Sequence, residues 1–336
     1  MQRYFAHKRC CAMTAEVLAD AGVQPTGNRL ASWDLYIPSY GGGFSTEIAD
    51  LLPSRSDQWV AGIPGSWRLT NKQMLWIGLC AAYGRQRAAQ LSPESWWLEA
   101  ARDRAALVEQ HREGSHYILK NPILQRRTGL RLTQDLSVLL AGPEQGYTLA
   151  QRLLPELVLL HRHRFNLRLY LLLTRQDGRL EFWLHRRGRC VCAPAPFSGD
   201  LMDAEAVISR SVGSDVLADG LPFSLSEAVH HLPRPQITLA RLDTVLCRVL
   251  MACRPGLQSA WCLSSNPAYQ LLGVDVTISN TGGVRIIEMN AGPDLRPHCS
   301  RDHALKYRIV RDLFEHISLL PQTRPSGFRR LDVRAP

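Results

Sequence analysis

Alternating apolar and polar positions predict several β-strands in this chain of 336 residues. Residues 165–173 alternate strongly and are rich in strand-forming side chains, so they predict a strand with its polar residues on one face. Two apolar runs, 272–278 and 284–290, flank the turn-forming residues 279–283 and predict a β-hairpin. Shorter runs predict further strands at 33–37, 117–120 and 181–185, the last pairing with 165–173 across the turn at 176–178.

Segments with apolar residues at helical spacing alternate with these strands. A helix is expected at 12–21, and another runs through 74–77, where Thr70 and Gln73 match a capping box. Further helices are expected at 95–112, 238–251 and 301–318. This alternation, without an internal repeat, predicts a mixed α/β fold.

The composition is that of a globular protein with an excess of positive charge. The hydrophobic content is 45% and no apolar run reaches the ~18 residues of a membrane span. The first residues lack the apolar segment of a secretory signal and the nine cysteines form no C-x-x-C pairs, so we expect a cytoplasmic protein with reduced thiols and no membrane contact. A net charge of +10 favours an anionic partner, but the basic residues are not arranged in nucleic-acid-binding motifs, which disfavours nucleic acid.

The hairpin predicted at 272–290 carries three candidate oxygen ligands. Glu288 lies thirteen positions after Asp275, and Asn290 follows Glu288 by two, which places Glu288 and Asn290 on one face of a strand. Carboxylate and amide oxygens suit a hard cation such as Mg²⁺ that also holds substrate phosphates. From spacing alone, the alternative is an ordinary hairpin with exposed acidic residues.

Polar side chains on two other predicted strands are candidates for binding an anion. Lys120 ends the strand at 117–120 just before a turn, where its ammonium group is placed to meet phosphate oxygens. The alternative is a solvated lysine at a strand end. Arg164, Asn166 and Arg168 share one face of the strand around 165–173, so that face meets an anionic group or water.

Taken together, these segments resemble the tubulin tyrosine ligase family of ATP-grasp ligases, from about residue 33 to residue 319. The densest agreement is at the hairpin, where Gly273-Val274-Asp275 and Glu288-Met289-Asn290-Ala291-Gly292-Pro293 are similar to the family's aspartate strand and E-V-N strand. The other matches follow in the family's order, at 64–72, 118–122, 151–154, 164–170 and Lys306.

The resemblance implies an ATP-grasp fold, with ATP bound between its last two lobes. The implied divisions are an N-terminal α/β lobe at 1–62, a central lobe at 63–153, a C-terminal lobe at 154–320 and a flexible tail at 321–336.

The resemblance also implies ATP-dependent ligation of an amino acid to a protein carboxylate through an acyl phosphate. Asp275, Glu288 and Asn290 would hold Mg²⁺, Lys120 would contact the inner phosphates, and Arg168 would bind the γ-phosphate or the acyl phosphate. The other implied contacts are Gln151, Arg152, Leu153 and Leu154 beside adenine, Arg164 and Asn166 in the nucleotide pocket, Gly129 in the loop over the phosphates, and Lys306 near the amino acid.

The nucleotide motifs depart from the family pattern at two places. The phosphate-covering loop reads Arg127-Thr128-Gly129 and keeps one glycine, which leaves the backbone less free to approach phosphates. Arg164 and Asn166 replace the family's lysine and aspartate, which affects the contact with the nucleotide.

The amino-acid pocket departs further. The family's arginine position falls on Val191, and Arg189, two residues earlier on the same strand face, is the nearest substitute. Arg210 stands where the family has asparagine and either supplies positive charge or blocks the site. The identity of the added amino acid is therefore not readable from the sequence.

The leading hypothesis is a monomeric ligase that adds a free amino acid, with glutamate preferred over tyrosine and glycine, to an acidic protein such as a tubulin tail. One alternative is a nucleotide-binding pseudoenzyme that acts as a protein-binding module. Another is an ATP-grasp ligase with a small-molecule or non-tubulin acceptor.

Overall fold

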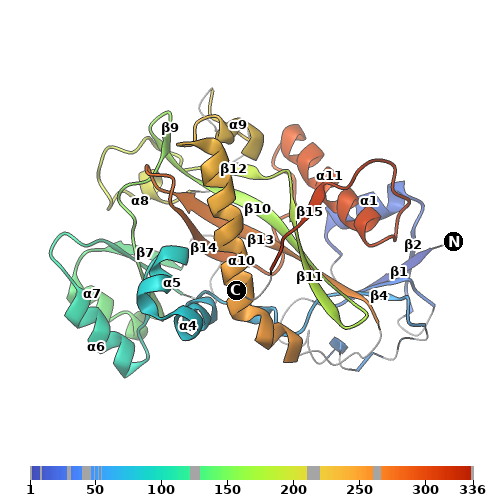
Figure 1. Cartoon of the computed structure of the whole chain (residues 1–336), viewed down its shortest axis with the longest axis horizontal. Coiled ribbons are helices and arrows are strands. Elements are labelled where there is room, and N and C mark those ends of the chain that lie inside the picture. The colour runs from blue at the N-terminus through green and yellow to red at the C-terminus, as the bar shows by residue number, and fades with distance from the viewer. Residues whose placement is uncertain are drawn as a thin grey trace.

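The computed structural model describes residues 2–7, 10–28, 32–39, 47–48, 50–51, 53, 55–121, 129–209, 220–259 and 266–333. In these ranges the chain forms one large mixed sheet and one small antiparallel sheet at the opposite end of the molecule from the N-terminal strands (Figure 1). The expected mixed α/β fold is therefore confirmed. None of the described helices combines the length and the apolar character needed to cross a bilayer.

The large sheet is built around two long antiparallel strands, β10 and β13. Its main path runs in the order β15 (Phe328–Arg330), β11 (Arg179–His185), β10 (His163–Gln176), β13 (Ala268–Ile278), β4 (Trp59–Ala61), β3 (Leu35–Ile37), β1 (Arg3–Ala6) and β2 (Gln24–Thr26). Three further strands branch from this path: β9 (Leu159–Leu160) and β12 (Arg189–Cys192) pair with β10, and β14 (Val284–Asn290) pairs with β13.

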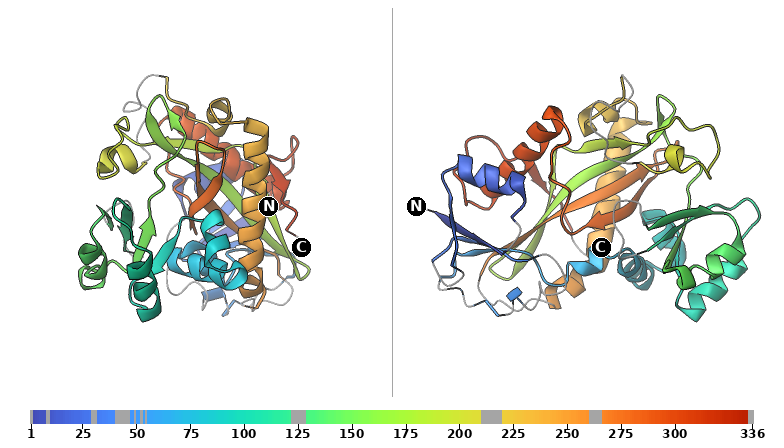
Figure 2. Two further views of the ribbon diagram at one scale, coloured as in Figure 1. Left: turned by 60° about the vertical axis from the view of Figure 1, so that its left-hand side comes forward. Right: turned by 180° about the vertical axis from the view of Figure 1, so that it is seen from behind.

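Both faces of the large sheet are buried, because alternate residues of β10 belong to two different cores. Leu167, Leu169 and Leu171 pack toward a core that includes the apolar side of α10 (Pro235–Ser259). Tyr170 and Leu172 point the other way. The opposite face is covered by α1 (Ala12–Asp20) and α11 (Ser300–His316), as the two views of Figure 2 show.

The small sheet has a core of its own. Its strand order is β5 (Ser95–Trp97), β8 (Leu149–Arg152), β6 (Tyr117–Lys120) and β7 (Leu130–Thr133), with every neighbouring pair antiparallel. Trp96, Tyr117 and Leu119 form its centre with helices α6 (Ala101–Gln110) and α7 (Leu136–Leu140). The remaining elements are α3 (Trp67–Thr70), α4 (Lys72–Tyr83), α5 (Arg85–Leu91), η1 (Pro143–Gln145), α8 (Ala204–Val207) and α9 (Leu225–Val229).

Two helix predictions need correction. Asn71, not Thr70, caps α4: its side-chain oxygen accepts hydrogen bonds from the backbone N–H groups of Gln73 and Met74, at 3.0 and 3.1 Å. The helix expected over 95–112 is the strand β5 followed by α6. The residues of β5 pair with β8 and therefore form a strand. The helical spacing of apolar residues that predicted one long helix holds only for the residues of α6.

The C-terminal segment also differs from the prediction. The tail expected to be flexible from residue 321 contains β15, which pairs with β11 through Trp183 and Arg330 and through His185 and Phe328. A strand of four residues or fewer is too short to show a clear alternation of apolar and polar positions in the sequence.

We expect a Gly327→Ala substitution to loosen this C-terminal strand. An added Cβ would collide with the side chains of His185 and Asp312, which are buried and joined by a contact of 3.0 Å between Nε2 and Oδ2. Because neither side chain is free to move away, the cost is about 1–3 kcal/mol of unfolding free energy. Urea unfolding measures it, with Gly27→Ala as the matched control because nothing lies within 4 Å of a Cβ there. Equal stabilities of the two variants would refute the clash.

Candidate nucleotide and metal site

The predicted hairpin exists and brings the expected oxygen ligands together. Asp275 on β13 lies directly opposite Glu288 on β14, and a β-bulge follows between Asp275 and Val276. Asn290 lies opposite Gly273 and its Nδ2 is 3.4 Å from Glu288 Oε1. Two carboxylates and an amide are a ligand set that fits Mg²⁺. Among the described residues there is no group of three or more His, Cys, Asp or Glu side chains that could hold a metal, so the amide would have to complete this set.

The strand register extends this pair into a row that crosses four strands. Arg189 on β12 lies opposite Arg168 on β10, Arg168 lies opposite Asp275, and Asp275 lies opposite Glu288. Because directly opposite residues project to the same side of a sheet, all four side chains lie on the face that α11 covers. We call these four residues the transverse row.

Ion pairs hold the acidic half of the transverse row. Arg168 binds Asp275 through both Nε and Nη2, the latter at 2.8 Å from Oδ2. Lys72, the first residue of α4, approaches Glu288 Oε2 to 3.2 Å. Gly273 makes room for this arrangement, since a Cβ there would come within 3.3 Å of Arg168 Cδ. Lys72 lies in the matching segment 64–72 but was not among the predicted site residues. The sequence did contain a signal for it, since Lys72 opens a helix that has no acidic residue in its first turn.

Lys120 approaches the same acids from the small sheet. Its Nζ donates to Gln151 Oε1 at 2.7 Å, and Gln151 Nε2 donates to Ser95 Oγ at 3.0 Å. Burial lowers the pKa of Lys120 to about 8, although Glu288 opposes this shift. Burial also opposes ionisation of Glu288, but Lys72 and Lys120 outweigh it and hold the pKa of Glu288 at about 2. The site therefore keeps an ionised glutamate among several cations.

Of the residues predicted beside adenine, Gln151 and Arg152 end β8, an inner strand of the small sheet, and Leu153 and Leu154 follow it. Leu153 donates its backbone N–H to the His116 carbonyl at 2.9 Å, and Arg152 Nε is 3.4 Å from Glu94 Oε2. Arg164 donates from Nη2 to the carbonyls of Leu154 and of Pro155, the latter at 3.0 Å.

The rest of the predicted nucleotide pocket is closed by internal contacts. Burial lowers the pKa of Arg164 to about 10, and its guanidinium lies 4.6 Å from the centre of the Phe197 ring. Asn166 Nδ2 donates to Ser209 Oγ at 2.7 Å. Gly129 accepts a backbone hydrogen bond from Asn121 at 2.8 Å. Arg127, Thr128 and Arg210 lie outside the described residues.

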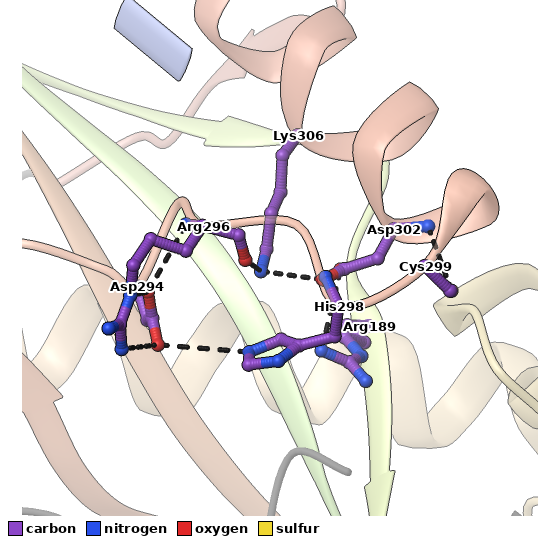
Figure 3. A network of polar contacts seen from close by, with 7 residues as sticks. All are labelled: Arg189, Asp294, Arg296, His298, Cys299, Asp302 and Lys306. Carbon is purple, nitrogen blue, oxygen red and sulfur yellow. Dashed lines mark hydrogen bonds and ion pairs between the residues drawn. The ribbon is translucent and has the colours of Figure 1, made fainter. Parts of the chain in front are cut away.

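The predicted amino-acid residues meet around an acid that the sequence reasoning missed. Lys306 Nζ donates to Asp302 Oδ2 at 2.7 Å, and Arg189 Nη1 lies 3.4 Å from Asp302 Oδ1 (Figure 3). All three side chains are buried. Asp302 is four residues before Lys306 on α11, a spacing that favours an ion pair on a helix and was visible in the sequence. Arg189 and Lys306 are thus brought together, but each already has a carboxylate partner.

Comparison with known proteins supports the resemblance. The tubulin-tyrosine ligase family matches residues 51–210 and 222–326. A probable tubulin polyglutamylase, ttll-9, of Caenorhabditis elegans is 25% identical over 168 residues, which covers 46% of this chain and 39% of that protein. The tubulin monoglutamylase TTLL4 is 21% identical in Mus musculus over 282 residues and 22% identical in Homo sapiens over 285 residues, in each case covering 77% of this chain and 23% of that protein.

The chain thus spans well under half the length of these relatives. The family match, in contrast, takes in most of the chain, including every residue of the transverse row. It agrees with the mixed α/β architecture and with the expected ATP-grasp class. The chain belongs to the tubulin-tyrosine ligase family.

Proposed function

We propose that this chain is an ATP-dependent ligase that joins an amino acid to a carboxylate of an acidic protein acceptor. The observation that supports this proposal most is the transverse row, which sets two arginines beside two acids on one face of a sheet. Because the relatives are described as tubulin glutamylases, glutamate and an acidic tubulin tail are the first substrates to test. The net charge of +10 favours such an acceptor.

The proposed chemistry requires an anionic carboxylate to approach an anionic γ-phosphate. Arg168, Lys72 and Lys120 place positive charge around the position where these groups would meet. Asp275 and Glu288, with Asn290, would hold Mg²⁺, which neutralises phosphate oxygens when it is bound.

Arg168 is oriented for this task by the protein itself. Its guanidinium carries five N–H donors, and Asp275 receives two hydrogen bonds from it, through Nε and Nη2. In this proposal the remaining donors bind phosphate oxygens, and the carboxylate fixes the plane in which they are presented. In this proposal Asp275 both contributes to the metal site and positions Arg168.

The test is a transfer assay with the whole protein. Purified chain is incubated with ATP, Mg²⁺, tubulin and labelled glutamate, glycine or tyrosine, and the acceptor is analysed by mass spectrometry. We expect one amino acid to appear on the acceptor only when ATP is present. Absence of transfer from all three, with tubulin and with a cell lysate, under conditions where ATP binding is demonstrated, would refute the proposal.

One observation favours a nucleotide-binding protein that does not ligate. Arg189 and Lys306, which are expected to meet the incoming amino acid, both pair with Asp302 inside the protein. The same assay separates the two functions, because a pseudoenzyme would bind ATP and transfer nothing.

A further inference from the structure

The polar network in Figure 3 has a buried side and a side that solvent reaches. The side chains of Arg189, Asp302 and Lys306 are 4, 0 and 2% exposed. Those of Asp294 and Arg296 are 40 and 56% exposed. His298, in the same segment between β14 and α11, is 28% exposed. A molecule that arrives from solvent therefore meets residues 294–298 before it meets Lys306 or Arg189.

The exposed side offers three different groups within five residues. Arg296 binds Asp294 through Nη2 at 2.9 Å and Nε at 3.0 Å, and His298 Nε2 lies 3.8 Å from Asp294 Oδ2. The backbone N–H of His298 donates to Asp302 Oδ2 at 3.0 Å, which ties the segment to the buried side. A guanidinium beside a carboxylate is complementary to the carboxylate and ammonium of an amino acid.

An incoming amino acid must lose a proton before it reacts, because an ammonium group has no lone pair to attack an acyl phosphate. Within the network of Figure 3, Lys306 is poorly suited to take this proton, since its Nζ donates to Asp302 and to the Arg296 carbonyl at 2.7 Å. Burial lowers the pKa of His298, Lys306 and Arg189 lower it further, and Asp302 and Asp294 oppose the shift. The lowered pKa favours the neutral imidazole, in which one ring nitrogen has a lone pair that can accept a proton.

We propose that His298 is the general base that deprotonates the incoming amino acid, which is held at Asp294 and Arg296. This inference rests on the proposed ligase function. The ammonium gives one proton to an imidazole nitrogen of His298. The amine nitrogen then bonds to the acyl carbon, the carbon–oxygen bond to the phosphate breaks, and the second amine proton leaves with inorganic phosphate. His298 returns its proton to solvent, so charge and atoms balance over the cycle.

The test compares His298→Gln with wild type between pH 5.5 and 9 in the transfer assay, using tubulin as acceptor and the labelled amino acid that wild type transfers. General-base catalysis contributes roughly 10²–10⁴-fold, so we expect the rate of the variant at pH 7 to fall by about 100-fold or more. The wild-type rate should decrease in acid as His298 becomes protonated. The rate of the variant should not show this decrease in acid. Added imidazole should restore its activity, and its ATP binding should be unchanged.

His303→Gln is the matched control. His303 lies close to His298 in the sequence, but it pairs with Glu16 on α1 at 2.8 Å. It should keep the wild-type rate and pH profile. An unchanged rate and profile for His298→Gln would overturn the assignment while the ligase function stands. Loss of ATP binding in that variant, or a loss of rate that imidazole does not restore, would identify a structural role and also overturn it. If wild type itself transfers no amino acid, the ligase proposal fails first.

Discussion

Replacing Glu288 with glutamine is expected to lower the rate of ATP-dependent amino-acid transfer by about 100-fold or more. The substitution keeps the size of the side chain but removes the charge that faces Lys72 and Lys120. It leaves the site with an excess of cations and with one carboxylate for a divalent metal. Initial rates measured over a range of Mg²⁺ concentrations check this expectation, and saturation should shift to higher Mg²⁺.

Glu181→Gln is the control for this experiment. Glu181 also pairs with a cation, Arg330, at 2.7 Å, but it does so on β11, away from the transverse row. It should retain the wild-type rate. A Glu288→Gln protein that transfers amino acid as fast as Glu181→Gln would show that the hairpin carboxylates are not part of the reacting site.

Replacing Arg168 with methionine is expected to destabilise the fold as well as abolish transfer. Asp275 is buried, with Arg168 bound to both of its oxygens, and burial already raises the pKa of Asp275 against the effect of Arg168. Removing one partner of a buried ion pair costs about 3–5 kcal/mol because the other charge is left without compensation. Urea unfolding followed by tryptophan fluorescence and by circular dichroism measures the loss.

The double variant Arg168→Met/Asp275→Asn distinguishes this cause from a simple loss of packing. Neutralising Asp275 removes the uncompensated charge, so the double variant should be more stable than Arg168→Met alone. Both proteins should fail to transfer amino acid. A double variant that is less stable than the single one would indicate that the methionine itself, and not the isolated charge, disturbs the core.

The long strands were predictable because their sequence pattern is dictated by burial on two faces. β10 and β13 contribute alternate residues to two cores, and the turn at 279–283 marks where the chain reverses. Two short strands were not predictable in the same way. β5 and β15 have three residues each, and their conformation is set by pairing with β8 and β11, which no local pattern encodes.

For the site, the sequence named most of the side chains but not their partners. Asp275 and Glu288 were expected together and are together. Arg189 and Lys306 were expected to face the substrate, yet Asp302 binds both of them. A resemblance locates residues along the chain, whereas ion pairing depends on which charges the register and the helix packing place within a few ångströms.

The transverse row sets a fixed distance across the proposed reaction site. Neighbouring strands are about 4.8 Å apart, so the backbones of Arg189 and Glu288 are separated by three strand spacings, or about 14 Å. Backbone hydrogen bonds between β12, β10, β13 and β14 maintain that separation, and a slip of one residue would turn Arg168 to the other face. The sheet therefore fixes the distance between Arg189 and the proposed metal ligands, and the turn at 279–283 helps to set the register of β13 and β14 on which that distance depends.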